Sequence, residues 1–199
     1  MAARGDSADD GSSLDTIIHR QRLTQRATAG KLFKIPKPTI AMINGAAAGA
    51  GLALALACDL RIMSNTAIMV TAFAKVGLPG DFGGTYFMSK LIGAAKAREM
   101  YYLSDRVSAD EALRLGLTNW VAEPGALRDE TMRLAARLAA GPSVAVRCMK
   151  ENLNRAMSGE IDDCLDLEAT HHVHCLATTD HRGAARAFVE GREPVFVGR

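Results

Sequence analysis

The sequence predicts an α/β protein in which short buried strands alternate with helices. The first indication is the stretch at residues 37–59, KPTIAMINGAAAGAGLALALACD, which reads as a strand, a loop of small residues and a helix. Two further apolar runs, at residues 59–64 and 67–70, fit short strands that follow this helix. From residue 126 onward the pattern is helical. Strands that alternate with helices, followed by a helical end, indicate the α/β class.

The composition indicates a soluble globular protein. A chain of 199 residues is long enough for one domain, and 48% apolar with 23% charged residues is ordinary for this class. A net charge of +2 gives no reason to expect a nucleic-acid partner. The longest apolar run, residues 46–58, has 13 residues, whereas a membrane helix needs roughly 20. Four cysteines without CxxC spacing indicate reduced thiols, so we expect a cytoplasmic protein with no membrane partner.

The N-terminal residues 1–13 are Gly, Ser, Ala and Asp without periodicity, which predicts a flexible segment. Ser13 or Asp15 is a candidate N-cap for a helix that runs to about Phe33. The Pro-Lys-Pro sequence at residues 36–38 then ends this helix, because proline breaks the hydrogen-bond ladder and disfavours helical geometry in the residue before it.

The stretch at residues 37–59 places a strand at residues 39–43, a loop at residues 45–51 and a helix after it. A loop of small residues lets backbone N–H groups at the helix start approach a ligand closely, and the helix dipole favours negative charge there. Tight packing of neighbouring elements explains the same composition equally well. The dinucleotide fingerprint is excluded because it needs glycine where Leu54 stands, and a P-loop is excluded because Lys and Ser or Thr do not follow Gly49.

The remaining elements follow in order along the chain. Residues 71–84 are irregular, and residues 85–103 predict one broken helix or two consecutive helices with an interruption near Gly93. Ser108 and Glu111 form a capping-box pattern that opens a short helix. That helix ends at Gly116, a strand is expected at residues 117–122, and helices are expected at residues 127–140, 142–157 (with Pro142 in its first turn), 160–177 and 180–190.

Several of these motifs together resemble the enoyl-CoA hydratase/isomerase (crotonase) family. The second signature of that family, KP-x-IA-x-(V/I)-NG-x-A-x-GGG…CD, is similar to residues 37–59. Further similar segments are KVGL at 75–78, GGT at 83–85, LSDRVSA at 103–109, EA…GL at 111–117 and TD…AF…REPVF at 179–196. Each motif alone is weak, but their order and spacing from about residue 14 to the C-terminus make the resemblance specific.

The resemblance implies a crotonase-like spiral of stacked ββα turns, shortened at its N-terminal end, with a C-terminal helical region. It implies a flexible segment at residues 1–13, a ββα core at 14–140 and a helical trimerisation and lid region at 141–199. The expected assembly is a homotrimer or a dimer of trimers. The segment around Phe188 resembles the part of the family that reaches the coenzyme A of a neighbouring site.

The family also implies an acyl-CoA thioester substrate, whose oxygen is held by two backbone N–H groups as it gains negative charge. By position the second donor is the N–H of Ala50, where the family usually has glycine. The same substrate-binding loop contains Gly45, Ala46, Gly49 and Gly51. No separate cofactor is expected, because coenzyme A is part of the substrate.

The first family signature, an AGG-D-like peptide that donates the other oxyanion N–H, is not spelled before Lys37. Two explanations are open: a start assigned too late, or an oxyanion hole with one donor. Loss of one such donor typically lowers kcat by a factor of about 10² to 10³. This departure keeps a non-catalytic acyl-CoA-binding or subunit-partner protein as an alternative to an enzyme.

The two catalytic glutamates of family hydratases fall, by alignment, on Ala53 and Phe73, which cannot exchange protons. One carboxylate remains in the following loop, Asp81, and some isomerases of the family look similar there. Without the family, capping of the helix expected near Gly83 explains Asp81 equally well. Since one base is sufficient to move a double bond, isomerisation is favoured, and hydration by Asp81 alone stays an alternative.

Bulky apolar residues near Asp81 are candidates for an acyl pocket, and core packing explains them equally well. They are Phe73, Leu78, Phe82 and Tyr86, with Phe87 and Met88 beside them. Farther along, His171, His172, His174 and Cys175 suggest a metal site. The family needs no metal there and no distant fourth ligand stands out, so we expect none.

Overall fold

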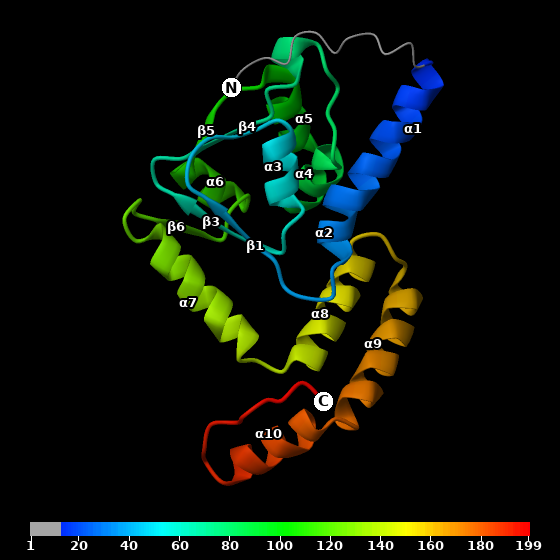
Figure 1. The fold of residues 1–199 in the computed structure, drawn as a ribbon, viewed down its shortest axis with the longest axis vertical. Coiled ribbons are helices and arrows are strands. Elements are labelled where there is room, and N and C mark those ends of the chain that lie inside the picture. The colour runs from blue at the N-terminus through cyan, green and yellow to red at the C-terminus, as the bar shows by residue number, and fades with distance from the viewer. Residues whose placement is uncertain (1–12) are drawn as a thin grey trace.

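The structure is a computed structural model that describes residues 13–199, and it divides into two small sheets with their helices and a C-terminal group of helices (Figure 1). The strands are β1 (Ile40–Ile43), β2 (Ala47–Ala48), β3 (Leu60–Ser64), β4 (Ile68–Val70), β5 (Val107–Ser108) and β6 (Trp120–Ala122). The helices are α1 (Leu14–Gln25), the π-helical η1 (Arg26–Gly30), α2 (Lys31–Lys34), α3 (Ala50–Leu56), the 3₁₀ turn η2 (Ala74–Val76), α4 (Gly84–Ile92), α5 (Ala94–Leu103), α6 (Ala109–Leu115), α7 (Leu127–Ala139), α8 (Ser143–Ala156), α9 (Ile161–Leu176) and α10 (Thr179–Val189).

Each of the two sheets is built from three strands that are not all consecutive in the chain. β1, β3 and β6 form a parallel sheet in the order β1-β3-β6, with Ile40 opposite Leu60 and Ile62 opposite Trp120. β2, β4 and β5 form the second sheet, in which β2 is parallel and β5 antiparallel to β4. Because β2 pairs with β4, with Ala48 opposite Val70, the turn between β2 and α3 lies beside the end of β4.

Apolar burial joins these sheets to the helices around them. The largest fully buried apolar side chains are Leu52, Met63, Met69, Met88 and Leu117. Phe87 and Met88 belong to this core cluster, so for these two residues packing is the role that the structure gives. The expected strands and helices of this region are present, which confirms the predicted α/β class.

Two predicted helix caps are observed. The Ser13 hydroxyl accepts from the Thr16 N–H at 3.3 Å at the start of α1, and the Ser108 hydroxyl accepts from the Glu111 N–H at 3.3 Å at the start of α6. The capping box at α6 is only half formed, however. The Glu111 carboxylate accepts from the guanidinium of Arg114, at 2.6 and 2.7 Å, one turn further along the helix.

The sequence interpretation was wrong about the loop at residues 45–51. Ala47 and Ala48 form β2 there, paired with Met69 and Val70 of β4, and α3 already begins at Ala50. An alanine pair carries little strand propensity, so this strand depends on its partner rather than on its own residues. Strand β5 was also missed, because it too has only two residues and depends on its pairing with β4. Pro142 lies at the N-cap of α8, one residue before the predicted first-turn position.

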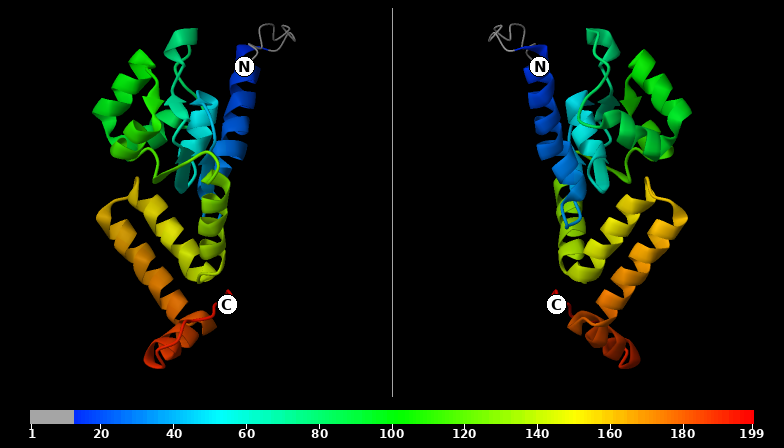
Figure 2. Two further views of the ribbon diagram at one scale, coloured as in Figure 1. Left: turned by 90° about the vertical axis from the view of Figure 1, so that its left-hand side faces the viewer. Right: turned by 90° about the vertical axis from the view of Figure 1, so that its right-hand side faces the viewer.

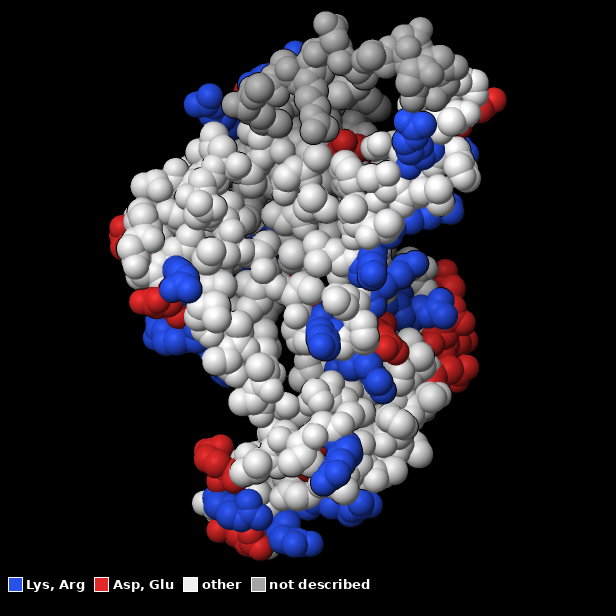
Figure 3. Space-filling view, viewed as in Figure 1, with Lys and Arg blue, Asp and Glu red and all other residues white. Residues whose placement is uncertain are grey.

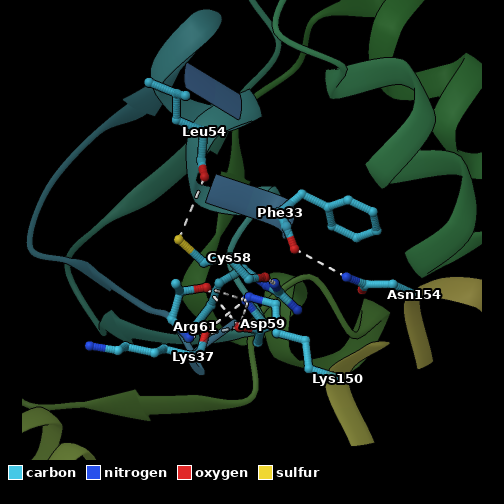
Figure 4. A network of polar contacts seen from close by, with 9 residues as sticks. Phe33, Lys37, Leu54, Cys58, Asp59, Arg61, Lys150 and Asn154 are labelled. Carbon is cyan, nitrogen blue, oxygen red and sulfur yellow. Dashed lines mark hydrogen bonds and ion pairs between the residues drawn. The ribbon is translucent and has the colours of Figure 1, made fainter. Parts of the chain in front are cut away.

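The C-terminal helices α8, α9 and α10 extend away from the sheets, as the two side views show (Figure 2). A buried polar network fastens α8 to the core (Figure 4). The Lys150 ammonium donates to the Asp59 carboxylate at 2.8 Å and to the carbonyl oxygen of Lys37 at 3.0 Å. Asp59 also accepts from the N–H and hydroxyl of Thr39, and Asn154 donates to the carbonyl oxygen of Phe33 at 3.1 Å.

Candidate active site

The turn between β2 and α3 presents the backbone donor that the resemblance implies. Gly49 adopts φ +52° and ψ −123°, which favours glycine, and its N–H donates to the Val70 carbonyl oxygen at 3.1 Å. Ala50 is the first residue of α3, so its N–H belongs to the donors that a helix leaves without an intrahelical partner. The turn therefore leaves the Ala50 N–H available for an acceptor outside the helix.

Phe73 packs directly against this turn. A Cβ atom built on Gly49 would lie 3.7 Å from the Phe73 ring and 3.6 Å from the Thr71 carbonyl oxygen. Gly45 and Gly51 have open space beside their Cα atoms. Among these three glycines, Gly49 alone has both a backbone conformation and a close packing environment that favour glycine over a larger residue. Ala46, in the same loop, is exposed.

Asp81 lies in a loop whose backbone is held in unusual conformations. Three of its residues have positive φ: Gly80 at 120°, Phe82 at 47° and Gly83 at 75°. The Oδ1 atom of Asp81 is buried and has no hydrogen-bond partner among residues 13–199. The N-cap of α4 is Gly83, and no side chain caps this helix. Capping, the alternative role for Asp81, is therefore not what the structure shows.

Burial changes the acidity of two groups in this region. Loss of solvent raises the pKa of the Asp81 carboxyl above its ordinary value. Burial, together with the nearby Asp81 charge, raises the pKa of Tyr101 to about 12. At neutral pH the Tyr101 phenol therefore keeps its proton, and Asp81 holds its proton more tightly than an exposed carboxylate does.

Tyr101, on α5, is a residue of this region that the sequence interpretation missed. Its ring stacks on Phe73, with ring centroids 6.0 Å apart and 9° between the ring planes. A Cβ atom on Gly80 would lie 3.1 Å from the Tyr101 ring, and one on Gly84 would overlap the Tyr101 hydroxyl. The sequence MYYL is typical of an ordinary helix, and it contains no signal that shows which of its two tyrosines packs inward.

The other candidate pocket residues are only partly brought together. Phe82 is half-buried next to Asp81, whereas Leu78 is 58% exposed. Tyr86 is 38% exposed and packs edge-on against Phe33 of α2, with centroids 6.4 Å apart. Phe188 is 87% exposed on α10, at the opposite end of the chain from α3 (Figure 1). Its predicted contact with a neighbouring site stays a prediction.

Two cavities in the described part of the chain lie away from Ala50 and Asp81. One of 540 Å³ lies between α8 and α9, and one of 590 Å³ lies between α7, α8 and residues 36–40. Neither is lined by the Gly49 turn or by the Asp81 loop. In the view of Figure 3 the middle of the core, around α3, carries few charged side chains, whereas charges gather around α8, α9 and α10.

The histidine-rich segment of α9 makes local polar contacts. The Nδ1 atom of His171 lies 2.5 Å from the Asn152 side-chain oxygen, and its Nε2 atom lies 3.3 Å from the Glu151 carboxylate. Among residues 13–199, no three His, Cys, Asp or Glu side chains are arranged to hold a metal ion.

Within the same residues, no helix combines the length and the apolar character that crossing a membrane requires.

The chain was compared with known protein families and curated proteins. The Enoyl-CoA hydratase/isomerase family profile matches residues 14–199. A short-chain-enoyl-CoA hydratase of Clostridium acetobutylicum is 36% identical over 163 residues, which is 82% of this chain and 62% of that protein. The 1,2-epoxyphenylacetyl-CoA isomerase of Escherichia coli is 36% identical over 169 residues, which is 85% of this chain and 64% of that protein. The chain thus spans less than two thirds of the length of either relative.

Solved structures of enoyl-CoA hydratases have a fold similar to that of this chain. The crystal structure of a putative enoyl-CoA hydratase from Streptomyces coelicolor matches with a TM-score of 0.90 and 31% identity, covering 94% of this chain and 68% of that one. An enoyl-CoA hydratase from Bacillus anthracis matches with a TM-score of 0.88 and 30% identity, covering 95% and 73%. The predicted crotonase-like fold is thereby confirmed. From its sequence and its fold alike, the chain belongs to the enoyl-CoA hydratase/isomerase (crotonase) family.

Proposed function

We propose that this chain acts on an enoyl-CoA thioester and moves its double bond, with Asp81 as the acid/base group and the Ala50 N–H as an oxyanion donor. The observation that carries this proposal is the Asp81 carboxylate, whose Oδ1 atom is buried without a hydrogen-bond partner in residues 13–199. A carboxylate kept in that state is costly, and such groups are typical of sites where a substrate supplies the partner. Coenzyme A enters as part of the substrate, so no separate cofactor is needed.

The proposed reaction needs one proton carrier and one oxyanion donor. Ionised Asp81 removes a proton from the carbon between the thioester and the double bond, and the negative charge passes to the thioester oxygen. The Ala50 N–H stabilises that oxygen, helped by the dipole at the start of α3. Protonated Asp81 then returns the proton at the far end of the former double bond. Its raised pKa favours this return, because the protonated carboxyl is populated closer to neutral pH.

Hydration is the second candidate reaction, and two neighbours of the site argue against it. Adding water requires a group to hold and deprotonate the water and usually a second group to protonate carbon. Ala53 is 1% exposed and Phe73 is 6% exposed, and neither side chain can hold a water molecule or donate a proton. Hydration would therefore depend on Asp81 alone.

The number of oxyanion donors affects the expected rate. The family peptide that supplies the other N–H is not spelled before Lys37 in this sequence. A site with one donor is expected to turn over about 10² to 10³ times more slowly than one with two. Tight acyl-CoA binding without any turnover would favour a non-catalytic acyl-CoA-binding protein.

The test compares Asp81→Asn with the starting chain in two assays: isomerisation of a 3-enoyl-CoA and hydration of a 2-enoyl-CoA. Loss of the proton carrier is expected to lower isomerisation by about 10² to 10⁴-fold. Asp105→Asn, at an exposed carboxylate in the connection between α5 and β5, is the matched control and should leave the rate unchanged. Full isomerisation by Asp81→Asn would refute the role of Asp81, and a dominant hydration rate would refute the choice of reaction.

We also infer that the chain assembles with copies of itself, as a homotrimer or a dimer of trimers. The C-terminal helices support this, because many large apolar side chains stay exposed on them. These include Leu153, Ile161, Leu165, Val173, Phe188 and Val189.

The four cysteines are free, which fits the expected reducing, cytoplasmic setting.

A further inference from the structure

Tyr101 lies where the parts of the proposed site meet. Its ring contacts Phe73 on one side, and Phe73 in turn packs against Gly49, next to the Ala50 N–H. The edge of the Tyr101 ring lies close to Gly80, and its hydroxyl lies against Gly84. One side chain on α5 therefore connects the oxyanion turn to both ends of the loop that carries Asp81.

The two glycines that flank the Asp81 loop, Gly80 and Gly84, have little room for a side chain. At Gly80 an added Cβ atom would come within 3.1 Å of the Tyr101 ring. At Gly84 it would overlap the Tyr101 hydroxyl and lie 3.1 Å from the Cβ atom of Ala53. The loop approaches Tyr101 so closely because glycine stands at both positions.

The same loop stores backbone strain. Phe82, which is not glycine, has φ 47°, between Gly80 at 120° and Gly83 at 75°. Conformations of this kind persist only where surrounding contacts determine them fully. The Asp81 Oδ1 atom, buried without a partner in the described chain, adds a further cost to the same conformation. A rigid support is therefore needed to keep the carboxylate where it is.

We propose that Tyr101 is the positioning residue for Asp81: its ring supports the Gly80–Gly84 loop so that the carboxylate stays fixed relative to the Ala50 N–H. This inference rests on the proposed function of Asp81 as the proton carrier. The stacked Phe73 ring extends the support to the oxyanion turn, so the distance between base and donor is set by a continuous row of packed side chains. Tyr101 acts through Asp81 and does not itself exchange a proton.

The charge state of Tyr101 is compatible with this role. The phenol is neutral below a pKa of about 12, so it places no negative charge beside Asp81 at physiological pH. From α5 the ionisable group that faces Asp81 is Tyr101, while Ala53 of α3 and Gly84 of α4 are uncharged. Removing the ring would admit water, and the raised pKa of Asp81 would fall toward its ordinary value.

The experiment measures isomerisation by Tyr101→Phe, Tyr101→Ala and the control Tyr102→Ala, whose side chain is 73% exposed on the same helix. Tyr101→Phe keeps the ring and should stay within about threefold of the starting kcat. Tyr101→Ala should lose on the order of 10²-fold in kcat, with KM little changed, since a small displacement of a catalytic group has that effect. Its rate profile should also shift its acid limb to lower pH. Tyr102→Ala should change neither quantity.

The result that would overturn the proposal is a Tyr101→Ala protein that keeps kcat and the acid limb of the starting chain. A protein that loses kcat in parallel with its folded fraction, at an unchanged acid limb, would also overturn it, because that is a purely structural effect. Asp81→Asn separates this from the proposed function. If Asp81→Asn is inactive while Tyr101→Ala is fully active, only the positioning role fails; if Asp81→Asn is fully active, the proposed function itself fails.

A second pair of variants tests the contact directly. Gly84→Ala should lower kcat strongly, because its methyl group would overlap the Tyr101 hydroxyl. Adding Tyr101→Phe removes that hydroxyl and should recover at least fivefold of the lost kcat, although the contact with Ala53 remains. Strictly additive losses in the double variant would contradict the contact on which the proposal depends.

Discussion

The α/β core and the C-terminal helices are stabilised by different kinds of contact. In the core, Met63, Met69 and Met88 are 0% exposed. In the region of α8, α9 and α10, the buried apolar side chains are Cys148 and Ala187, and α9 has no buried residue. The contacts that hold this second region in place are mostly polar, and among them are the Lys150–Asp59 pair and Asp180, whose carboxylate accepts from the N–H groups of Val197 and Gly198.

This difference indicates how much of the fold each region can form by itself. The core buries a continuous apolar cluster and resembles the interior of an ordinary domain. The C-terminal helices leave apolar side chains facing solvent, as is expected of a surface that another molecule covers. The proposed site lies in the core, whereas assembly is expected to depend on the C-terminal helices. Variants in each region should therefore fail in different ways.

The largest effect is expected from emptying part of the core. Met88→Ala removes a side chain that is 0% exposed and leaves a cavity, so the free energy of unfolding should fall by about 2 to 5 kcal/mol. Denaturant titration of the chain measures this change. Met132→Ala, on α7 with 58% exposure, is the control and should cost less than about 0.5 kcal/mol. Equal losses at both positions would show that the core is not packed as described.

The next largest effect is expected at the polar attachment of α8. Lys150→Met leaves Asp59 without its 2.8 Å partner, and the free energy of unfolding should fall by about 2 to 4 kcal/mol. Asp59 is 25% exposed, so water compensates part of the loss. The double variant Lys150→Met with Asp59→Asn removes both charges and should recover part of the stability. Limited proteolysis of Lys150→Met should cut first at the connection between α7 and α8. A first cut within the core instead would show that the Lys150–Asp59 pair does not hold the C-terminal helices in place.

A third prediction concerns the exposed face of α9. Val173→Glu places a charge on a side chain that is 65% exposed in the single chain, and the proposed assembly should weaken by at least about tenfold in Kd. The fold of the separate chain should not change, because Val173 contributes little to it. Sedimentation measures the assembly and circular dichroism measures the fold. Asp162→Lys, also on α9, is the control for a charge change elsewhere on the same helix, and equal dissociation by both would show that the effect is not specific to Val173.

The sequence predicted most of the element order because long periodic segments and local signals determine it. The breaks at Pro36 and Gly93 and the caps at Ser13 and Ser108 each depend on residues within a few positions. Strands β2 and β5 were not predicted, since two-residue strands such as Ala47–Ala48 exist only through pairing with β4. Pairing with a distant segment leaves no periodic trace in the sequence.

For the site, sequence reasoning identified Asp81 and Ala50 as candidates through the family resemblance, and their roles stay predictions. It could not identify the surroundings of Asp81. The positive φ of Phe82, the stacking of Tyr101 on Phe73 and the unpartnered Oδ1 atom all follow from three-dimensional packing between α4, α5 and the end of β4. A helix pattern such as MYYL does not say which tyrosine turns inward.

The smallest effect is expected at Asp81, whose ionised carboxylate lowers the stability of the folded chain. Because the pKa of Asp81 is raised in the folded chain, the unfolded chain releases this proton more readily, and folding loses stability as pH rises from the ordinary carboxyl pKa to the raised one. The cost is absent below that window and complete above it. Asp81→Asn carries no charge at any pH, so its Tm should exceed that of the starting chain at pH 7, on the order of 1 to 2 °C, and match it in acid. A lower Tm for Asp81→Asn at pH 7 would mean that a hydrogen-bond donor within the chain stabilises the Asp81 charge, and the carboxylate would then have no need of a substrate.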